Sequence, residues 1–393
     1  MSHARHFSRF LAADPGRLHL AAHSHHGWPD VTEAGQRQAW LDAITLADRK
    51  WDKVFGEVVP AFQVHVARRL ALSDPATIAV APNTFDFVRR LLSCLPPRPG
   101  ENRPARILTT DAEFHSFARQ TARLEEDGRL KVTRIAAEPF DSFPARFAEA
   151  AGQGGHDLVF VSQVFFDSGY VVEDLAGLVG AVRGEETLVV VDGYHGFMAL
   201  PTDLSAIGNR AFYLAGGYKY AMSGEGACFM HCPPGYAPRP PDTGWYAAFG
   251  ALAGDAGSVA YAPDGGRFLG ATFDPSGLYR FNAVMDWLDG LDLQVDAIDA
   301  HVRSVMTVFL AALERRPVAG LDPAALLRRP GVDATGHFLT FRTPQAGSLQ
   351  ERMMAANVVA DHRRDRLRLG FALYHEPADA DAYLARIAAA LDD

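Results

Sequence analysis

The sequence predicts an α/β protein in which a mostly parallel sheet forms a large domain and a smaller α+β domain follows it. The chain has 393 residues, more than one hydrophobic core usually supports, which favours two domains. Short apolar runs rich in β-branched residues alternate with segments of helical periodicity, as in repeated βαβ units. The last hundred residues differ, with a long helical pattern before short strands and a final amphipathic helix.

Four β-rich runs separated by helical segments predict parallel strands at 106–110, 157–163, 187–192 and 212–216. The run 226–234 follows its predecessor too closely for a helical crossover, so we expect it to join the sheet antiparallel.

The two ends of the chain are expected to lie outside this sheet. The periodicity predicts one long helix from about Leu288 to Arg315. A helical segment at 31–51 has no strand after it until about Ile78, and we expect it to pack on the small domain or on a partner subunit. The predicted division is an N-terminal segment 1–55, a large domain 56–285 and a small domain 286–393.

Composition argues against several functions. Apolar residues make up 48% and charged residues 22%, without a run that could span a bilayer. A net charge of −9 opposes binding to nucleic-acid phosphates. The N-terminus lacks the apolar core of a signal peptide, so a cytoplasmic location is expected. Neither the three cysteines nor the histidines within 23–26 have metal-ligand spacing, so we expect free thiols and no metal.

An aspartate and a lysine follow two neighbouring strands. Asp192 ends the run 187–192, and Lys219 lies just after the run 212–216. Ligands of open α/β sheets bind at the carboxyl ends of the strands, which would bring these two residues together.

This pair suits pyridoxal phosphate (PLP). A desolvated lysine of lowered pKa can form a Schiff base, and a carboxylate can keep the pyridine nitrogen of PLP protonated. Lys219 and Asp192 are therefore the candidates for these two roles. Taken alone, the pair fits a surface lysine and a helix-capping aspartate equally well.

The residues around this pair, VDGYH at 191–195 and GGYKY at 216–220, resemble the aminotransferase class V superfamily of fold-type I PLP enzymes, and within it the kynureninases. The resemblance implies the fold-type I architecture, with a seven-stranded sheet in the large domain. It also implies that His195 contacts the phenolic oxygen of the cofactor and that Tyr218 contacts its phosphate.

Three further motifs resemble this family. In APNTFDF, Asn83 and Thr84 would begin a helix whose free N–H groups bind the phosphate, or would be a plain helix cap. In TTDAEFHSF, Phe114 would stack on the cofactor ring, or would be a core phenylalanine. In GRFLGATFD, Thr272 matches a threonine that reaches the phosphate across a dimer interface, which implies a homodimer with shared active sites.

The substrate half of the site is assigned by two more motifs. The segment DRLRLGFALYH is similar to one whose arginine holds the substrate α-carboxylate, a task suited to a planar cation with two donors. Arg368 is our choice, and strand alternation puts Arg364 and Arg366 on the same face. The N-terminal LHLAAHSHHGWP resembles the kynureninase segment that lines the substrate mouth, which assigns His23 and Ser24.

The resemblance implies cleavage of the Cβ–Cγ bond of an amino acid of the L-kynurenine type. Lys219 would take the Cα proton, and Tyr218 or a water chain would act as acid and base. Flat apolar area for an aromatic substrate would come from the side chains Phe165, Phe166, Trp245 and Tyr246.

The chain also departs from the kynureninase pattern. QVFFDSG stands where kynureninases have HVNYKTG, so Gln163 and Phe165 replace a histidine and an asparagine beside the cofactor. The alternatives are therefore a class V aminotransferase, a C–S β-lyase, or a PLP-fold protein without catalysis. A cysteine desulfurase is disfavoured, because no cysteine follows Cys232 to carry the persulfide.

Overall fold

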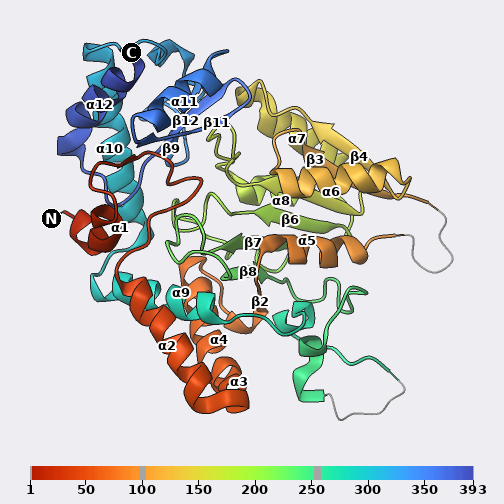
Figure 1. Cartoon of the computed structure of the whole chain (residues 1–393). Coiled ribbons are helices and arrows are strands. Elements are labelled where there is room, and N and C mark those ends of the chain that lie inside the picture. Colours follow the sequence, from red (N-terminus) through yellow and green to blue (C-terminus); the bar gives the residue numbers. More distant parts are fainter. Residues whose placement is uncertain (1, 97–102, 252–257, 393) are drawn as a thin grey trace.

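The structure is a computed structural model that describes residues 2–96, 103–251 and 258–392. Within these residues, seven strands form a central sheet in the order β2-β8-β7-β6-β5-β3-β4 (Figure 1). Their bounds are β2 (Ile78–Ala81), β3 (Ala105–Thr110), β4 (Leu130–Ile135), β5 (Leu158–Ser162), β6 (Leu188–Asp192), β7 (Ala211–Gly216) and β8 (Cys228–His231). Strands β3 to β7 are parallel, and β8 is antiparallel to both β7 and β2, which confirms the predicted sheet.

Both faces of the sheet are covered by helices. Alternate residues of β5 point to opposite sides, since Phe160 stacks on Phe117 of α6 (His115–Glu126) while Val159 joins the core under α7 (Phe143–Gly152) and α8 (Leu175–Ala181). Helix α5 (Thr84–Ser93) shares the face of α6. Burial on both faces explains why the central strands read as continuous apolar runs.

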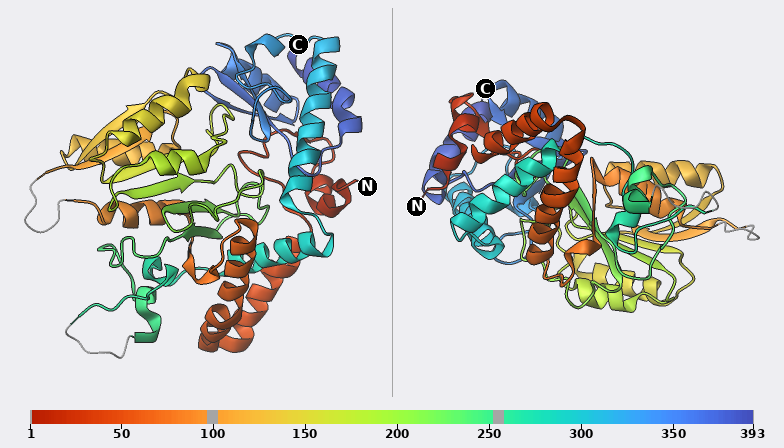
Figure 2. Two further views of the ribbon diagram at one scale, coloured as in Figure 1. Left: turned by 180° about the vertical axis from the view of Figure 1, so that it is seen from behind. Right: turned by 90° about the horizontal axis from the view of Figure 1, so that it is seen from below.

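The small domain is built on an antiparallel sheet in the order β11-β12-β9. Its elements are α10 (Val295–Arg315), β9 (Phe338–Arg342), α11 (Ala346–Ala355), β10 (Val358–Val359), β11 (Asp361–Arg363), β12 (Arg366–Gly370) and α12 (Ala380–Asp392). They enclose their own apolar core. The N-terminal strand β1 (Leu18–His19) pairs in parallel with β10, and Figure 2 shows the N-terminal helix α1 (Ser8–Ala12) beside this domain. The N-terminus is thereby tied to the C-terminal part of the chain.

The predicted long helix is two helices in the structure. Helix α9 (Ser276–Gly290) ends before α10 begins, and Asp292 between them has a φ of 52°. Aspartate tolerates this left-handed backbone better than most residues, so the break leaves little trace in the apolar periodicity.

Helix α2 (Val31–Leu46) packs along α9. The Tyr279 hydroxyl donates to Asp42 over 2.8 Å, and a Cβ at Gly35 would come within 2.7 Å of the Tyr279 carbonyl oxygen. Within this chain α2 therefore packs on a helix that runs across the predicted boundary at residue 285. The three-part division of the chain stays a prediction.

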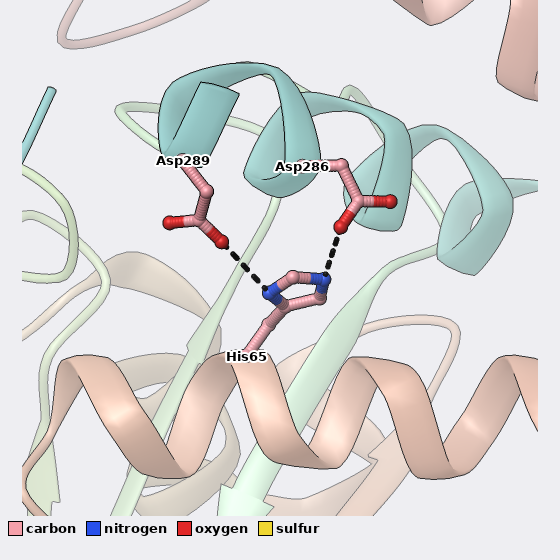
Figure 3. Close-up of side chains that lie close together, drawn as sticks. All are labelled: His65, Asp286 and Asp289. Carbon is pink, nitrogen blue, oxygen red and sulfur yellow. Dashed lines mark ion pairs between the residues drawn. The ribbon is translucent and has the colours of Figure 1, made fainter. Parts of the chain in front are cut away.

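Helix α4 (Val59–Arg69) is joined to α9 by an ionic cluster (Figure 3). His65 Nε2 lies 3.1 Å from Asp286, and its Nδ1 lies 3.8 Å from Asp289. Arg68 and Arg69 also pair with Asp289, and their positive charges oppose the binding of a metal cation. The cluster therefore links α4 to α9 through ion pairs. None of the described helices is long and apolar enough to cross a membrane.

Candidate active site

A cavity of about 570 Å³ lies at the carboxyl ends of β5, β6 and β7. Most of the residues assigned from the sequence line it, namely His23, Ser24, Asn83, Thr84, Phe114, Asp192, His195, Tyr218, Lys219 and Arg368. A larger hollow of about 990 Å³ lies near the amino ends of β5 and β6 and contains none of them. The smaller cavity is the candidate active site, and it joins the N-terminal segment, the large domain and the small domain.

Lys219 is buried within this cavity. Its chain segment follows β7 through Gly217, where a Cβ would come within 1.9 Å of Ser223 Oγ and 3.2 Å of the Gly224 carbonyl oxygen, so this close turn favours glycine. The Nζ atom lies 2.5 Å from His195 Nε2, with the rings of Tyr194 and Phe114 at 4.9 and 5.4 Å. Burial lowers the pKa of Lys219 to about 7, against the opposing charge of Asp192. A large share of the amine is therefore neutral near pH 7 and able to attack a carbonyl carbon.

Asp192 ends β6 beside Ser162 of β5 and Leu214 of β7. Its Oδ1 accepts a hydrogen bond from the Tyr194 backbone N–H over 2.9 Å, and burial raises its pKa. No lysine, arginine or histidine of the described residues lies within ion-pair distance of this carboxylate. A buried carboxylate is costly without a cation, and a protonated pyridine nitrogen would supply one.

His195 fits the same group. Its Nδ1 is buried without a hydrogen-bond partner among the described residues, while its Nε2 faces Lys219. Burial holds the pKa of His195 well below its ordinary value, so the ring is neutral and can donate or accept one hydrogen bond. An oxygen on the cofactor ring would satisfy the free nitrogen.

The first turn of α5 opens on the cavity through Thr84 and Phe85. Asn83 caps this helix, since its side-chain oxygen accepts from the Asp86 backbone N–H over 3.0 Å. The cap orients the helix N-terminus toward the cavity, where the helix dipole favours an anion. The two predicted roles of this motif, phosphate binding and helix capping, are therefore compatible, with Asn83 as the cap of a turn that could bind phosphate.

Phe114 presents its ring to the cavity and is 40% exposed, so the alternative of a core phenylalanine is wrong. The residue before it, Glu113, is buried and accepts hydrogen bonds from Thr110 over 2.7 Å and from Ser162 over 2.5 Å. Burial raises the pKa of Glu113 to about 8. These bonds hold the loop after β3 against the end of β5.

Arg368 on β12 of the small domain lines the cavity and is almost fully buried. Its two terminal nitrogens donate to the Phe166 carbonyl and to Asp361, and its Nε has no hydrogen-bond partner in the described part of the chain. The guanidinium is thus oriented with donors to spare for a substrate carboxylate. The neighbouring Arg364 lies in the turn between β11 and β12, with a φ of 52°, so the prediction that it shares the strand face is wrong.

Several assigned residues lie elsewhere. Phe165 is in the core against Phe143 and Tyr170, and its neighbour Phe166 reaches the cavity instead, so the assignment of Phe165 to substrate is wrong. Gln163 also points away from the cavity, because its amide donates to Thr202 and accepts from Tyr213.

The segment after β8 places its aromatic residues outside the cavity lining. Trp245 stacks on Tyr246 at 4.3 Å, and Tyr246 packs against Phe55 of the helical region near the N-terminus. Neither lines the cavity of its own chain, and neither does Thr272. The role of Thr272 across a dimer interface stays a prediction.

Sequence reasoning missed some residues of the cavity. Ser162, the last residue of β5, and Val164, two residues beyond it, line the cavity, and this spacing is the signal that extended chain offers. Tyr194 stands inside the VDGYH motif between two assigned residues. Asp361, which orients Arg368, has no recognisable sequence signal, because the pairing of β11 with β12 brings it there.

Comparisons with known proteins agree with this geometry. Residues 96–334, more than half of the chain, match the family described as aminotransferase class V. The comparison with curated proteins gives no match.

Solved structures share the fold over nearly the whole chain. A cystine C–S lyase in complex with its product cysteine persulfide is similar at 16% identity, covering 95% of this chain and 97% of that chain, with a TM-score of 0.77. A cysteine desulfurase from Thermococcus onnurineus NA1 is similar at 13% identity, covering 100% and 99%, with a TM-score of 0.80. The cysteine desulfurase CsdA from Escherichia coli is similar at 16% identity, covering 100% and 99%, with a TM-score of 0.74.

Three features of the described residues fit one cofactor, namely the buried lysine, the aspartate without an ion-pair partner and the helix N-terminus that opens on the cavity, and the family match agrees with it. The chain belongs to the aminotransferase class V family, and its cofactor is pyridoxal phosphate.

Proposed function

We propose that this protein is a PLP-dependent C–S β-lyase, which breaks the Cβ–S bond of a cysteine-derived amino acid. The motifs that resemble those of kynureninases surround the cofactor, and such motifs do not determine which reaction is catalysed. The choice between reactions rests on the substrate half of the cavity and on the cysteines.

The cysteines carry the proposal. Cys228 and Cys232 are buried, burial raises the pKa of both thiols to about 12, and none of the three cysteines lines the cavity. Sulfur therefore has no protein thiolate on which to leave, as a desulfurase of the persulfide type requires. A lyase that releases the sulfur as a free thiol or persulfide needs no such residue, and one of the similar structures is a cystine C–S lyase.

The residues of the cavity have the roles that this reaction needs. Bound PLP would supply an electron sink for the charge that develops at Cα. Arg368 binds the α-carboxylate and fixes the orientation of the substrate. Lys219 takes the Cα proton, and its lowered pKa matches a base that works near neutral pH. Phe114 and Tyr194 flank the amine and exclude water from it.

A second candidate is kynureninase-like cleavage of a Cβ–Cγ bond. Phe114 and Phe166 form an edge-to-face pair at 5.5 Å on the cavity wall, which offers apolar area to an aromatic substrate. The other aromatic residues assigned to this purpose lie outside the cavity lining, so the C–S reaction is the first proposal.

A substrate panel separates these candidates. Purified enzyme is mixed with L-cystine, S-ethyl-L-cysteine or L-kynurenine, and pyruvate, thiol and anthranilate are measured. Pyruvate and thiol in equal amounts support the lyase, and anthranilate fluorescence alone supports the second candidate. A stable pyridoxamine spectrum with a released keto acid identifies an aminotransferase. The Lys219→Ala variant, expected to be inactive in every case, is the control for non-enzymatic breakdown.

A further inference from the structure

His23 is fully buried, and neither of its ring nitrogens has a hydrogen-bond partner among the described residues. The pairing of β1 with β10 and the bridge between Ala21 and Gly370 carry this residue to the cavity, which it lines. Its ring stacks on Phe338 at 4.7 Å, and a Cβ at Gly370 would come within 2.1 Å of Nδ1. Packing thus fixes the orientation of the imidazole, while its two nitrogens can still form hydrogen bonds with a bound molecule.

The cations near His23 oppose a charge on it in the free enzyme. Burial is the main cause that holds its pKa well below the ordinary value, and the charges of Arg368 and Lys219 add to the effect, with smaller contributions from Arg363 and His19. Asp361 is the opposing group, with Oδ2 3.8 Å from His23 Nε2. A substrate carboxylate bound to Arg368 would offset the charge that opposes protonation of His23 most strongly, which favours protonation of His23 once substrate is in place.

The other proton carriers of the cavity are already engaged. Lys219 faces His195, and the Tyr218 hydroxyl lies 3.1 Å from His25 Nδ1. Among the described residues that line the cavity, only His23 is a fully buried histidine with neither ring nitrogen hydrogen-bonded. We propose that His23 is the general acid that protonates the departing sulfur, a role that rests on the proposed C–S cleavage.

The protons balance in this scheme. The substrate arrives with an α-ammonium group next to the carboxylate that Arg368 binds, and His23 accepts one of its protons. Lys219 removes the Cα proton. The Cβ–S bond then breaks with both electrons going to sulfur, and His23 returns its proton to that atom. The thiol leaves, and the rest of the substrate takes up one water to give pyruvate and ammonia. The ammonia takes the proton that Lys219 removed from Cα and leaves as ammonium, so His23 and Lys219 are both neutral again.

The test compares two leaving groups in the PLP-loaded enzyme. S-ethyl-L-cysteine releases an alkyl thiolate that needs a proton, whereas S-(4-nitrophenyl)-L-cysteine releases an aryl thiolate that is stable without one. For His23→Asn we expect the ethyl substrate to slow by about 10²–10³-fold and the nitrophenyl substrate by less than about fivefold, the range of general acid catalysis. The visible absorption of bound PLP checks that the variant folds and loads. If His23→Asn does not fold or load PLP, His23→Gln, which also lacks a titratable ring, is used in its place.

A matched control is His156→Asn, at the amino end of β5 and outside this cavity, which should change neither rate. Equal slowing of both substrates by His23→Asn, or no slowing, would overturn the acid role and leave the lyase assignment intact. A loaded wild-type enzyme that cleaves neither substrate would overturn the lyase assignment, and the acid role with it.

Discussion

The Nζ atom of Lys219 lies 2.5 Å from Nε2 of His195, and both groups are buried. Burial lowers the pKa of both, that of Lys219 to about 7, so near neutral pH the His195 ring is neutral and about half of the Lys219 amine is neutral. The lysine lone pair is therefore available near neutral pH, which an exposed lysine does not offer.

The first prediction follows from this pair. Apoprotein mixed with PLP and then reduced with sodium borohydride should carry the cofactor on the peptide that contains Lys219, as read by mass spectrometry. Labelling should rise between about pH 6 and pH 8 and then level off, because a lysine amine is neutral above its pKa. Lys219→Arg should abolish this label, whereas Lys131→Arg, at an exposed position on β4, should keep it. Labelling spread evenly over surface lysines would contradict the assignment.

The second prediction concerns Asp192, whose buried carboxylate has no cation within ion-pair distance among the described residues. Asp192→Asn keeps the shape and the acceptor for the Tyr194 N–H and removes the charge. Turnover should fall on the order of 10²–10³-fold, the usual effect of losing one preorganised electrostatic group. Because burial raises the pKa of Asp192 in the folded state, its charge destabilises the folded apoprotein at neutral pH.

Asp192→Asn should therefore raise the thermal midpoint of the apoprotein while weakening PLP binding. Calorimetry with and without PLP measures both effects. A lower midpoint for the variant apoprotein would show that the carboxylate has a stabilising partner in the folded chain.

The residues of the cofactor half of the cavity could be predicted from the sequence, whereas many of those in the substrate half could not. Asp192 and Lys219 follow strands, and Asn83 precedes a helix, so periodicity alone indicates which edge of the sheet they occupy. Phe165 and Phe166 show the limit of this reasoning. Both follow β5, and a shift of one residue decides which of them reaches the cavity, since neighbouring side chains in extended chain point to opposite sides.

Pairing between strands positions other residues of the substrate half of the cavity. Asp361 orients Arg368 because β11 folds back on β12, and His23 reaches the cavity because β1 pairs with β10. Neither pairing has a local signal. The break between α9 and α10 differs, because Gly290 at the end of α9 is a local signal that the prediction of one long helix did not use.

The third prediction is a loss of stability in acid. His19, His26 and His375 surround Tyr374 at the contact of the N-terminal segment with the small domain, and burial lowers their pKa values to about 2, 3 and 4. In the unfolded chain these rings take up protons below about pH 6.5. Stability from the neutral rings is thus present above that pH and is lost as the pH falls toward the folded values.

Each ring should contribute a slope of up to about 1.4 kcal/mol per pH unit below its unfolded pKa. Urea unfolding at pH 7.5, 6.5 and 5.5 measures the slope. His19→Gln, which can still meet the Tyr374 hydroxyl, should lower the slope by about one proton. A free energy of unfolding that does not change between pH 6.5 and 5.5 would contradict this account.

The last prediction tests the carboxylate anchor. Arg368 uses two terminal nitrogens to bond the Phe166 carbonyl and Asp361, and a lysine ammonium cannot span both partners and a substrate carboxylate in one plane. Arg368→Lys should therefore raise KM for an S-substituted cysteine by about 10–100-fold, the value of one or two hydrogen bonds to a charged group. Binding of PLP should be unchanged, because Arg368 belongs to the substrate half.

The discriminating ligand is an S-substituted cysteamine, which has the amine and the sulfur but no carboxylate. Its affinity, followed by the change in cofactor absorption, should be the same in both proteins if Arg368 acts on the carboxylate, and should fall in the variant if the arginine only supports the cavity wall.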